Sequence, residues 1–274
     1  MATALEPTKT KIAKRVIEVF EYFDESHRRA TVMDIARRFG WPQSSTSELL
    51  ACLVEMGFLY KDAYSRSYMP TPRIALLGSA AQPKLLHNGR LLPLMDQLAS
   101  TLRLGVGLMG TVGANVQIFH WISRDDRASE HYVDLGSGLA APLTRSVGGL
   151  MLLSAHGPLH QGAVMRRLNA EAPPEGRVIV KDAQDRILMF QRQRCAIGES
   201  GFGVDADMCA VLIPNMPSER QLAIGVVYHR DSGQDTAAIA DVLKEAVARF
   251  ARAPAENESY VRPPQLADLT TAAA

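Results

Sequence analysis

The sequence predicts an α+β protein that has an N-terminal winged helix-turn-helix domain and a C-terminal domain made of an antiparallel sheet with helices on one face. Three observations support this. Two short amphipathic segments flank the turn Gly40-Trp41-Pro42, a hairpin signature follows them directly, and strand-like and helix-like runs alternate beyond residue 104. The length of 274 residues is enough for two domains.

Composition excludes several classes of protein. The chain has 30 Lys and Arg against 29 Asp and Glu, a net charge of +1, which excludes a polybasic protein but permits a local basic patch. Cys52, Cys195 and Cys209 are widely spaced, which argues against a disulfide framework or a structural zinc. Because no apolar run approaches ~20 residues and the first residues lack a signal-peptide core, we expect a cytoplasmic protein without a membrane partner.

The first two helices are indicated by spacing and by capping residues. Apolar residues at intervals of three and four predict a helix over residues 11–22. Thr31, with Asp34 three positions later, is the N-cap signature of a second helix, and Gly40 ends it.

A third helix and a hairpin complete the predicted domain. The helix begins after Pro42 and ends at Gly57. The β-prone runs 58–60 and 67–69 enclose the turn 62–66, which predicts a hairpin in the place of a wing. On periodicity alone, an ordinary helical bundle fragment capped by a hairpin is an equal alternative to a DNA-binding domain.

The rest of the chain alternates between helical and strand-like patterns. Residues 71–103 predict a connector helix followed by a second helix. Strand-like runs follow at 104–112, 116–122, 129–135, 208–213 and 221–228, and helical runs at 146–154, 160–168, 182–194 and 235–250.

At this point the sequence resembles a known family. The stretch from Thr31 to Leu59, TVMDIARRFGWPQSSTSELLACLVEMGFL, closely resembles the winged-helix core of IclR-type transcriptional regulators, and YMPTPRIALLG at 68–78 resembles the end of their wing. More weakly, GLAAPLTRSVGG at 138–149 and GFGVD at 201–205 resemble motifs of their second domain. The resemblance runs from about residue 9 to 250, in the order and spacing of the family.

The resemblance implies a domain plan and partners. It divides the chain into a winged helix-turn-helix domain at 9–71, a linker helix at 72–90 that dimerises, a GAF-like effector-binding domain at 91–252 and a flexible tail at 253–274. It implies a homodimer or homotetramer on palindromic double-stranded operator DNA, regulated by a small-molecule effector and with no cofactor. Repression is the working expectation, although the sequence does not separate a repressor from an activator.

The candidate DNA-binding residues follow from how a recognition helix contacts DNA. Its N-terminal residues meet base edges in the major groove, where Gln suits adenine and Glu suits cytosine. The family usually carries basic residues where Gln43 and Glu48 stand, so we expect phosphate contacts to come from elsewhere. For Trp41, packing in the turn is favoured over a backbone contact. The predicted set is Lys9, Lys11, Lys14, Arg38, Gln43, Ser44, Ser45, Ser47, Glu48 and Arg66.

The candidate effector site is carried over from the resemblance. The last strand of the family's pocket here lacks Ser and Thr, which favours an apolar or aromatic effector over a small acid. Aromatic side chains are candidates for the lining, with core packing as the alternative for each, and a closed pocket that binds nothing also remains open. The predicted set is Phe119, Tyr132, Val147, Gly148, Asp205, Cys209, Gly225 and Val227.

Catalysis finds little support in the sequence. It contains no GxSxG, HExxH, GxxxxGK[ST] or GxGxxG pattern, so we expect no enzyme. His156 and His160 are four residues apart, but Gly157-Pro158 interrupts the helix that a metal pair needs. The alternative is a GAF-like thiol redox enzyme or sensor that uses Cys195 and Cys209.

Overall fold

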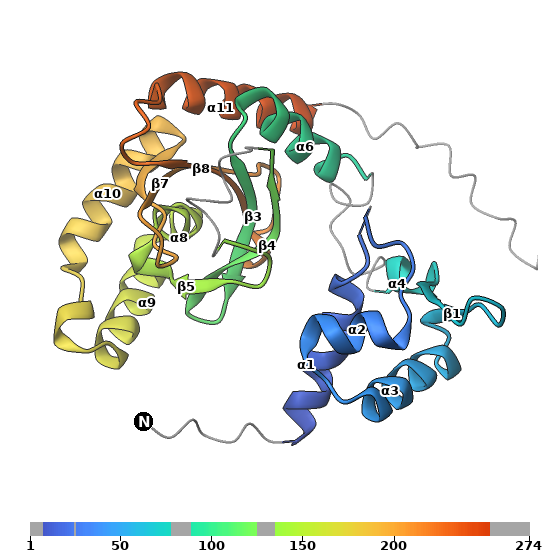
Figure 1. The fold of residues 1–274 in the computed structure, drawn as a ribbon. Coiled ribbons are helices and arrows are strands. Elements are labelled where there is room, and N and C mark those ends of the chain that lie inside the picture. Colours follow the sequence, from blue (N-terminus) through green and yellow to red (C-terminus); the bar gives the residue numbers. More distant parts are fainter. Residues whose placement is uncertain (1–7, 25, 78–88, 125–134, 253–274) are drawn as a thin grey trace, which may run out of the picture. The chain divides into compact units, whose positions relative to one another are not determined.

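The computed structural model describes residues 8–24, 26–77, 89–124 and 135–252 (Figure 1). The chain forms two compact units, Met1–Gln82 and Pro83–Ala274, and each is described by itself. Most of the predicted linker helix, the predicted strand at 129–135 except its last residue, and the predicted tail at 253–274 lie outside the described residues.

The N-terminal unit contains the three predicted helices and the predicted hairpin, so this part of the fold prediction is confirmed. A short helical turn, α4, follows the hairpin. The elements are α1 (Thr8–Glu21), α2 (Val32–Phe39), α3 (Gln43–Glu55), β1 (Leu59–Lys61), β2 (Tyr68–Pro70) and α4 (Arg73–Leu76). Their core contains Val19 of α1, Ile35 of α2 and Leu50 and Leu53 of α3.

The boundaries of α2 arise from the capping residues that the sequence predicts. Thr31 Oγ1 accepts the Asp34 N–H at 3.3 Å, and the Asp34 carboxylate accepts the Thr31 N–H at 2.8 Å, which forms a capping box. The carboxylate accepts hydrogen bonds from the Thr31 backbone N–H and, at 2.8 Å, from the Thr31 hydroxyl, and these two bonds hold the pKa of Asp34 below its usual value, the backbone bond having the largest effect. Gly40 ends the helix with φ of 66°, a left-handed conformation that suits glycine.

The wing is a two-stranded antiparallel hairpin whose turn is organised by Asp62. Lys61 pairs with Tyr68, and Asp62 Oδ1 accepts the N–H groups of Tyr64 at 2.9 Å and Ser65 at 3.1 Å. Ala30, just before α2, exchanges two backbone hydrogen bonds with Tyr68. The wing is thereby fixed to the segment that leads into α2.

The C-terminal unit is built on a six-stranded antiparallel sheet with the order β5-β4-β3-β8-β7-β6. The predicted strands at 104–112, 116–122, 208–213 and 221–228 are confirmed, whereas β5 and β6 at the two edges were not predicted. The strands are β3 (Gly105–Val112), β4 (Asn115–Ser123), β5 (Ala140–Pro142), β6 (Ala196–Glu199), β7 (Ala206–Leu212) and β8 (Leu222–His229).

Helices cover both faces of this sheet, so the prediction of helices on one face was wrong (Figure 1). On one face lie α6 (Leu91–Leu102) and α11 (Thr236–Arg252), and on the other α8 (Val147–Leu153), α9 (Pro158–Glu171) and α10 (Val180–Gln193). The physical reason is visible in β8, where residues 222–228 are all buried, so both sides of the strand need a covering layer. Short 3-10 turns stand at Leu143–Arg145, Pro174–Gly176 and Ser218–Arg220. Within the described ranges, every helix is too short or too polar to cross a membrane.

The capping box gives a first testable prediction. Thr31→Ala removes one side-chain partner of the box and should lower the free energy of unfolding of the N-terminal unit by about 1 kcal/mol. Fluorescence of Trp41 in a Trp121→Phe background reports this unit alone. Because the pKa of Asp34 is lower in the folded chain, its contribution is complete at neutral pH and is lost as the pH falls below about 4. Asp34→Asn should therefore reduce the acid sensitivity of unfolding, and an unchanged acid profile would contradict the assignment.

Candidate functional site

The exposed face of α3 is polar and carries no Lys or Arg. Thr46, Leu50 and Leu53 are buried at helical spacing, which leaves the opposite face to solvent. The exposed residues are Gln43, Ser44, Ser47, Glu48, Ala51, Cys52 and Glu55. Four of the five residues predicted on α3 therefore present their side chains together on one surface.

Ser45, the fifth, is half-buried because its hydroxyl already has partners within the protein. Ser45 Oγ donates to the Pro42 carbonyl at 3.2 Å and accepts from Arg15 Nη2 at 3.3 Å. Thr46 Oγ1 donates to the same carbonyl at 2.9 Å. Arg15 comes from α1, thirty residues earlier in the chain. Through its hydrogen bond with Arg15, Ser45 helps to hold the first turn of α3 against α1.

Arg15 also covers the turn between α2 and α3. Its guanidinium carbon lies 4.1 Å from the centroid of the Trp41 ring, and Trp41 stacks on Phe39 with ring centroids 4.7 Å apart. The packing role predicted for Trp41 is confirmed. Arg15 Nε is buried and has no hydrogen-bond partner among the residues that the structure describes, a cost that the stacking and the Ser45 contact must offset.

Sequence reasoning missed the importance of Arg15. Arg15 follows Lys14 directly in the sequence, and this pair of basic residues marked the segment as a possible binding surface. Its contact with Ser45 on α3 could not be deduced, because spacing along α1 does not show which other helix packs against it.

The predicted phosphate-binding cations have different surroundings. Lys11 and Lys14 are exposed on α1, and Arg66 is exposed in the wing with a left-handed φ of 52°. Arg38 is exposed at the end of α2 and lines a hollow of about 600 Å³ together with Asp24, Asp34 and Arg37. Lys9 belongs to α1, but its side chain lies outside the described residues. Lys11, Lys14, Arg38 and Arg66 are thus all exposed, and Arg38 differs in having carboxylates and a second arginine in the same hollow.

The tip of the wing carries a second residue that sequence reasoning missed. The Tyr64 side chain is 99% exposed. It stands on the turn that Asp62 organises, two residues before Arg66. An aromatic ring held in water on a short ordered turn is a candidate contact for a partner molecule.

Four of the predicted effector residues come together in the C-terminal unit, but methionine side chains fill the space between them. Val147 and Val227 belong to one core cluster with Met109 and Met208, which are fully buried. Gly148 and Gly225 face the same two thioethers. A Cβ at Gly225 would lie 2.7 Å from Met109 Cε and 2.7 Å from Met208 Sδ, closer than packed atoms tolerate. No room for an effector remains between these groups in this conformation.

The other predicted effector residues lie apart from this cluster. Cys209 packs into the core under α6 and α11, on the opposite face of the sheet. Phe119 is the extra residue of a β-bulge in β4 and is 44% exposed. Asp205 is exposed and pairs with Arg230 at 3.5 Å. Tyr132 lies outside the described residues.

The two thiols of the alternative hypothesis lack the properties of reactive cysteines. Burial raises the pKa of Cys195, and it raises the pKa of Cys209 to about 12. A reactive thiol needs a lowered pKa and access to solvent, whereas both side chains are buried. The geometry therefore does not favour thiol chemistry at these positions.

The comparisons with known proteins agree with the geometry of the N-terminal unit. Residues 13–63 match the family model of the IclR helix-turn-helix domain. Comparison with curated proteins gives no match.

Similar solved structures cover most of the chain. An IclR homologue from Microbacterium hydrocarbonoxydans, complexed with 4-hydroxybenzoate, is 20% identical over 88% of this chain and 97% of its own, with a TM-score of 0.56. A regulator from Alicyclobacillus acidocaldarius is 16% identical over 90% and 98%, also with a TM-score of 0.56. An IclR-family regulator from Brucella abortus is 20% identical over 88% and 91%, with a TM-score of 0.50.

These findings define the class of the protein as a helix-turn-helix protein with a second, sheet-based domain. More particularly, the first unit is an IclR-type helix-turn-helix domain, and the chain has the fold of IclR-type transcriptional regulators, so the family resemblance is confirmed.

The contacts of Arg15 predict a positioning role that differs from a phosphate contact. Arg15→Gln and Arg15→Lys both lose the planar stack on Trp41 and should reduce the preference for a selected duplex over a scrambled one by about tenfold. Their salt dependence of binding should stay unchanged, because no phosphate contact is lost.

Lys14→Gln is the matched control. It should lower the salt slope by about 1 and keep the sequence preference. If Arg15→Gln behaves like Lys14→Gln, Arg15 is a phosphate contact and the positioning role is wrong. Circular dichroism checks that the variants are folded.

The buried methionines give a prediction on stability. Met208→Ala should lower the free energy of unfolding of the C-terminal unit by about 2–5 kcal/mol, because it leaves a cavity beside Gly225. Met208→Leu nearly conserves the volume and should cost less than about 1.5 kcal/mol. Unfolding followed by Trp121 fluorescence in a Trp41→Phe background measures the loss of stability in each of the two Met208 variants. Equal losses in both variants would contradict the packing described here.

Proposed function

We propose that this chain is a transcriptional regulator that places α3 in the major groove of an operator and responds to a small organic effector. The observation that carries the proposal is the exposed polar face of α3, held by Arg15 in an IclR-type helix-turn-helix domain. A face of small polar side chains on a well-packed helix suits contact with base edges.

In this proposal, the exposed residues of α3 supply sequence specificity, and basic residues outside α3 supply affinity for the DNA backbone. Gln43 can pair with adenine, Glu48 can accept from the cytosine amino group, and Ser44 and Ser47 can donate or accept. Glu48 and Glu55 carry negative charge, so α3 itself is repelled by phosphates. Attraction to the backbone must then come from Lys11 and Lys14 on α1 and Arg66 in the wing, with Tyr64 beside it.

The proposed assembly is a two-fold symmetric homodimer, or a homotetramer made from two such dimers. A symmetric dimer presents two copies of α3 to two half-sites of a palindrome, about one helical turn or a multiple of it apart. Repression is the proposed mode of action, because a regulator bound at an operator blocks access to it.

An aromatic or apolar effector is proposed for the C-terminal unit. The support is the absence of Ser and Thr on β8 and the apolar cluster around Met109 and Met208, whose flexible side chains can rearrange. One structural neighbour is complexed with 4-hydroxybenzoate, so this compound belongs in a first screen by thermal shift.

Alkylation of Cys52 tests whether α3 faces the DNA. Of the three cysteines, Cys52 is exposed on α3, and Cys195 and Cys209 are buried. A duplex obtained by in vitro selection should slow the reaction of Cys52 with N-ethylmaleimide by at least about tenfold, because bound DNA covers this face. Mass spectrometry of the modified protein gives the rate at each cysteine.

Two controls accompany this experiment. A scrambled duplex of the same length, at a salt concentration where it does not bind, should leave the rate unchanged. The variant Ser47→Cys in a Cys52→Ser background moves the probe toward the N-terminus of α3 and should show stronger protection. If Cys52 in the unmodified chain and the thiol introduced by Ser47→Cys both react at the free rate with saturating selected duplex, α3 does not face the DNA.

A further inference from the structure

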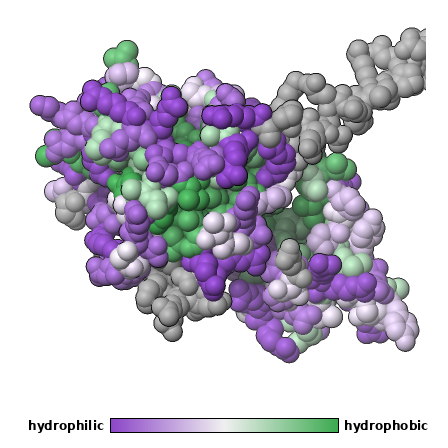
Figure 2. Space-filling model, turned by 90° about the horizontal axis from the view of Figure 1, so that it is seen from above, coloured by the Kyte–Doolittle hydropathy of each residue, from purple (hydrophilic) through white to green (hydrophobic). Residues whose placement is uncertain are grey.

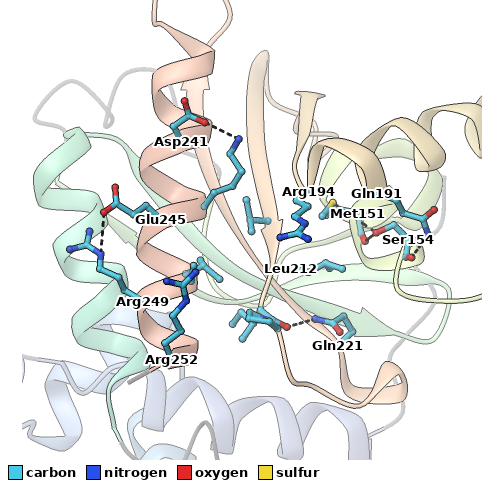
Figure 3. Close-up of a pocket in the computed structure, with 16 residues that line it drawn as sticks. Met151, Ser154, Gln191, Arg194, Leu212, Gln221, Asp241, Glu245, Arg249 and Arg252 are labelled. Atoms are coloured by element: carbon cyan, nitrogen blue, oxygen red, sulfur yellow. Dashed lines mark hydrogen bonds and ion pairs between the residues drawn. The ribbon is translucent and has the colours of Figure 1, made fainter. Parts of the chain in front are cut away.

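A groove of about 800 Å³ opens at one edge of the sheet in the C-terminal unit. Figure 3 shows it between α11 and the ends of α8 and α10, with β7 and β8 between them. This volume lies within the range of small-molecule sites. The groove is separate from the methionine-filled cluster, because it adjoins the C-terminal end of α8, at Met151 and Ser154, whereas Val147 and Gly148 lie at the N-terminal end.

The groove exists because β6 is shorter than β7. Pairing between these strands begins at Ala196 opposite Ala210, and the chain before Ala196 turns away into α10. Ile213 donates its N–H to Leu222 O on β8, so the N–H and C=O of Leu212 point toward the side where β6 is absent. An open piece of strand edge therefore forms part of the wall.

Apolar side chains make up much of the surface of the groove. Leu212 and Ala248 are half-buried and Pro214 is exposed, and they contribute apolar atoms from β7, the segment after it, and α11, above the buried Val211, Ile213 and Val247. The space-filling view shows apolar surface gathered within a polar surround on one face of the molecule (Figure 2). An apolar body lying in this groove gains free energy by leaving water.

Two arginines at the groove carry charges that no side chain balances within the described chain. Lys244 pairs with Asp241 at 2.8 Å, and Arg249 pairs with Glu245 at 3.8 Å, so these four charges compensate one another. Arg194 and Arg252 have no ion pair among the described residues, and Figure 3 shows both side chains directed into the groove. Arg194 stands at the C-terminal cap of α10, and Arg252 ends α11.

We propose that this groove binds an organic carboxylate with an apolar body. The carboxylate accepts hydrogen bonds from Arg194 or Arg252, because guanidinium groups match carboxylates in shape and charge. The apolar body lies against Leu212, Pro214 and Ala248. The inference concerns binding to the C-terminal unit and does not depend on the proposed binding of DNA.

Paired probes test the charge requirement on the full-length chain without DNA. Octanoate and octan-1-ol share an apolar chain, as do 4-phenylbutyrate and 4-phenylbutan-1-ol, and each pair differs in the carboxylate. Isothermal titration calorimetry should give saturable binding of each acid, with a dissociation constant at least about tenfold lower than that of its alcohol. Equal affinity of acid and alcohol, or no binding of either acid, overturns the proposal.

Variants locate the site. Arg194→Gln combined with Arg252→Gln should raise the dissociation constant of the bound acid by at least about tenfold. Arg192→Gln is the matched control, because Arg192 is an exposed arginine of α10 that does not line the groove, and it should leave the constant unchanged. If the double variant and the control give the same constant, the acid binds elsewhere and the proposal fails.

A steric variant makes the same test without changing any charge. Ala248 lines the groove from α11 and is half-buried, so Ala248→Trp places a large ring in the space. Binding of the acid should be lost, while circular dichroism and the melting temperature report whether the unit is folded. A folded Ala248→Trp that binds the acid as the unmodified chain does overturns the proposal. An acidic extended peptide that pairs with Leu212 and binds where both acids fail would identify a different occupant and also overturn it.

Discussion

Burial of Leu50 and Leu53 beneath α1 and α2 is the interaction on which the N-terminal unit depends. It fixes the rotation of α3 about its axis, and a helix that hides one stripe must offer the opposite stripe to its surroundings. The Arg15 guanidinium then fixes the first turn, through Trp41 and Ser45. The hydrophobic packing thus determines which side chains of α3 are exposed. The contacts of Arg15 with Trp41 and Ser45 hold the N-terminal end of the helix in place.

Much of the fold could be predicted from the sequence because its helices carry strong local signals. Thr31, Asp34 and Gly40 mark both ends of α2 within the segment itself. The edge strands β5 and β6 could not be predicted, because strands of three and four residues have too little alternation to be recognised unless, as in β1 and β2, a turn signature joins two β-prone runs. Coverage of both sheet faces was also missed, although the unbroken apolar run of β8 indicates it.

The candidate sites were predictable where periodicity decides exposure, and not where distant parts of the chain meet. Gln43, Ser44, Ser47 and Glu48 share a face because helical geometry demands it. The engagement of Ser45 by Arg15 joins residues on two helices, which no local pattern encodes. Likewise, Cys209 neighbours Met208 in the chain but belongs to the opposite face of the sheet, because neighbouring strand residues alternate.

The proposed recognition helix, α3, has acidic side chains and no basic ones, and this has a consequence for the search along a genome. In the proposed complex, Glu48 meets no cytosine amino group at most positions, and its carboxylate then lies in the major groove without a partner, close to phosphates. In this proposal, the protein distinguishes its operator from other DNA as much by the unfavourable burial of Glu48 at other sequences as by favourable contacts at the operator. A regulator that binds DNA in this proposed way spends less time on non-specific DNA, so fewer molecules per cell suffice to occupy its operator.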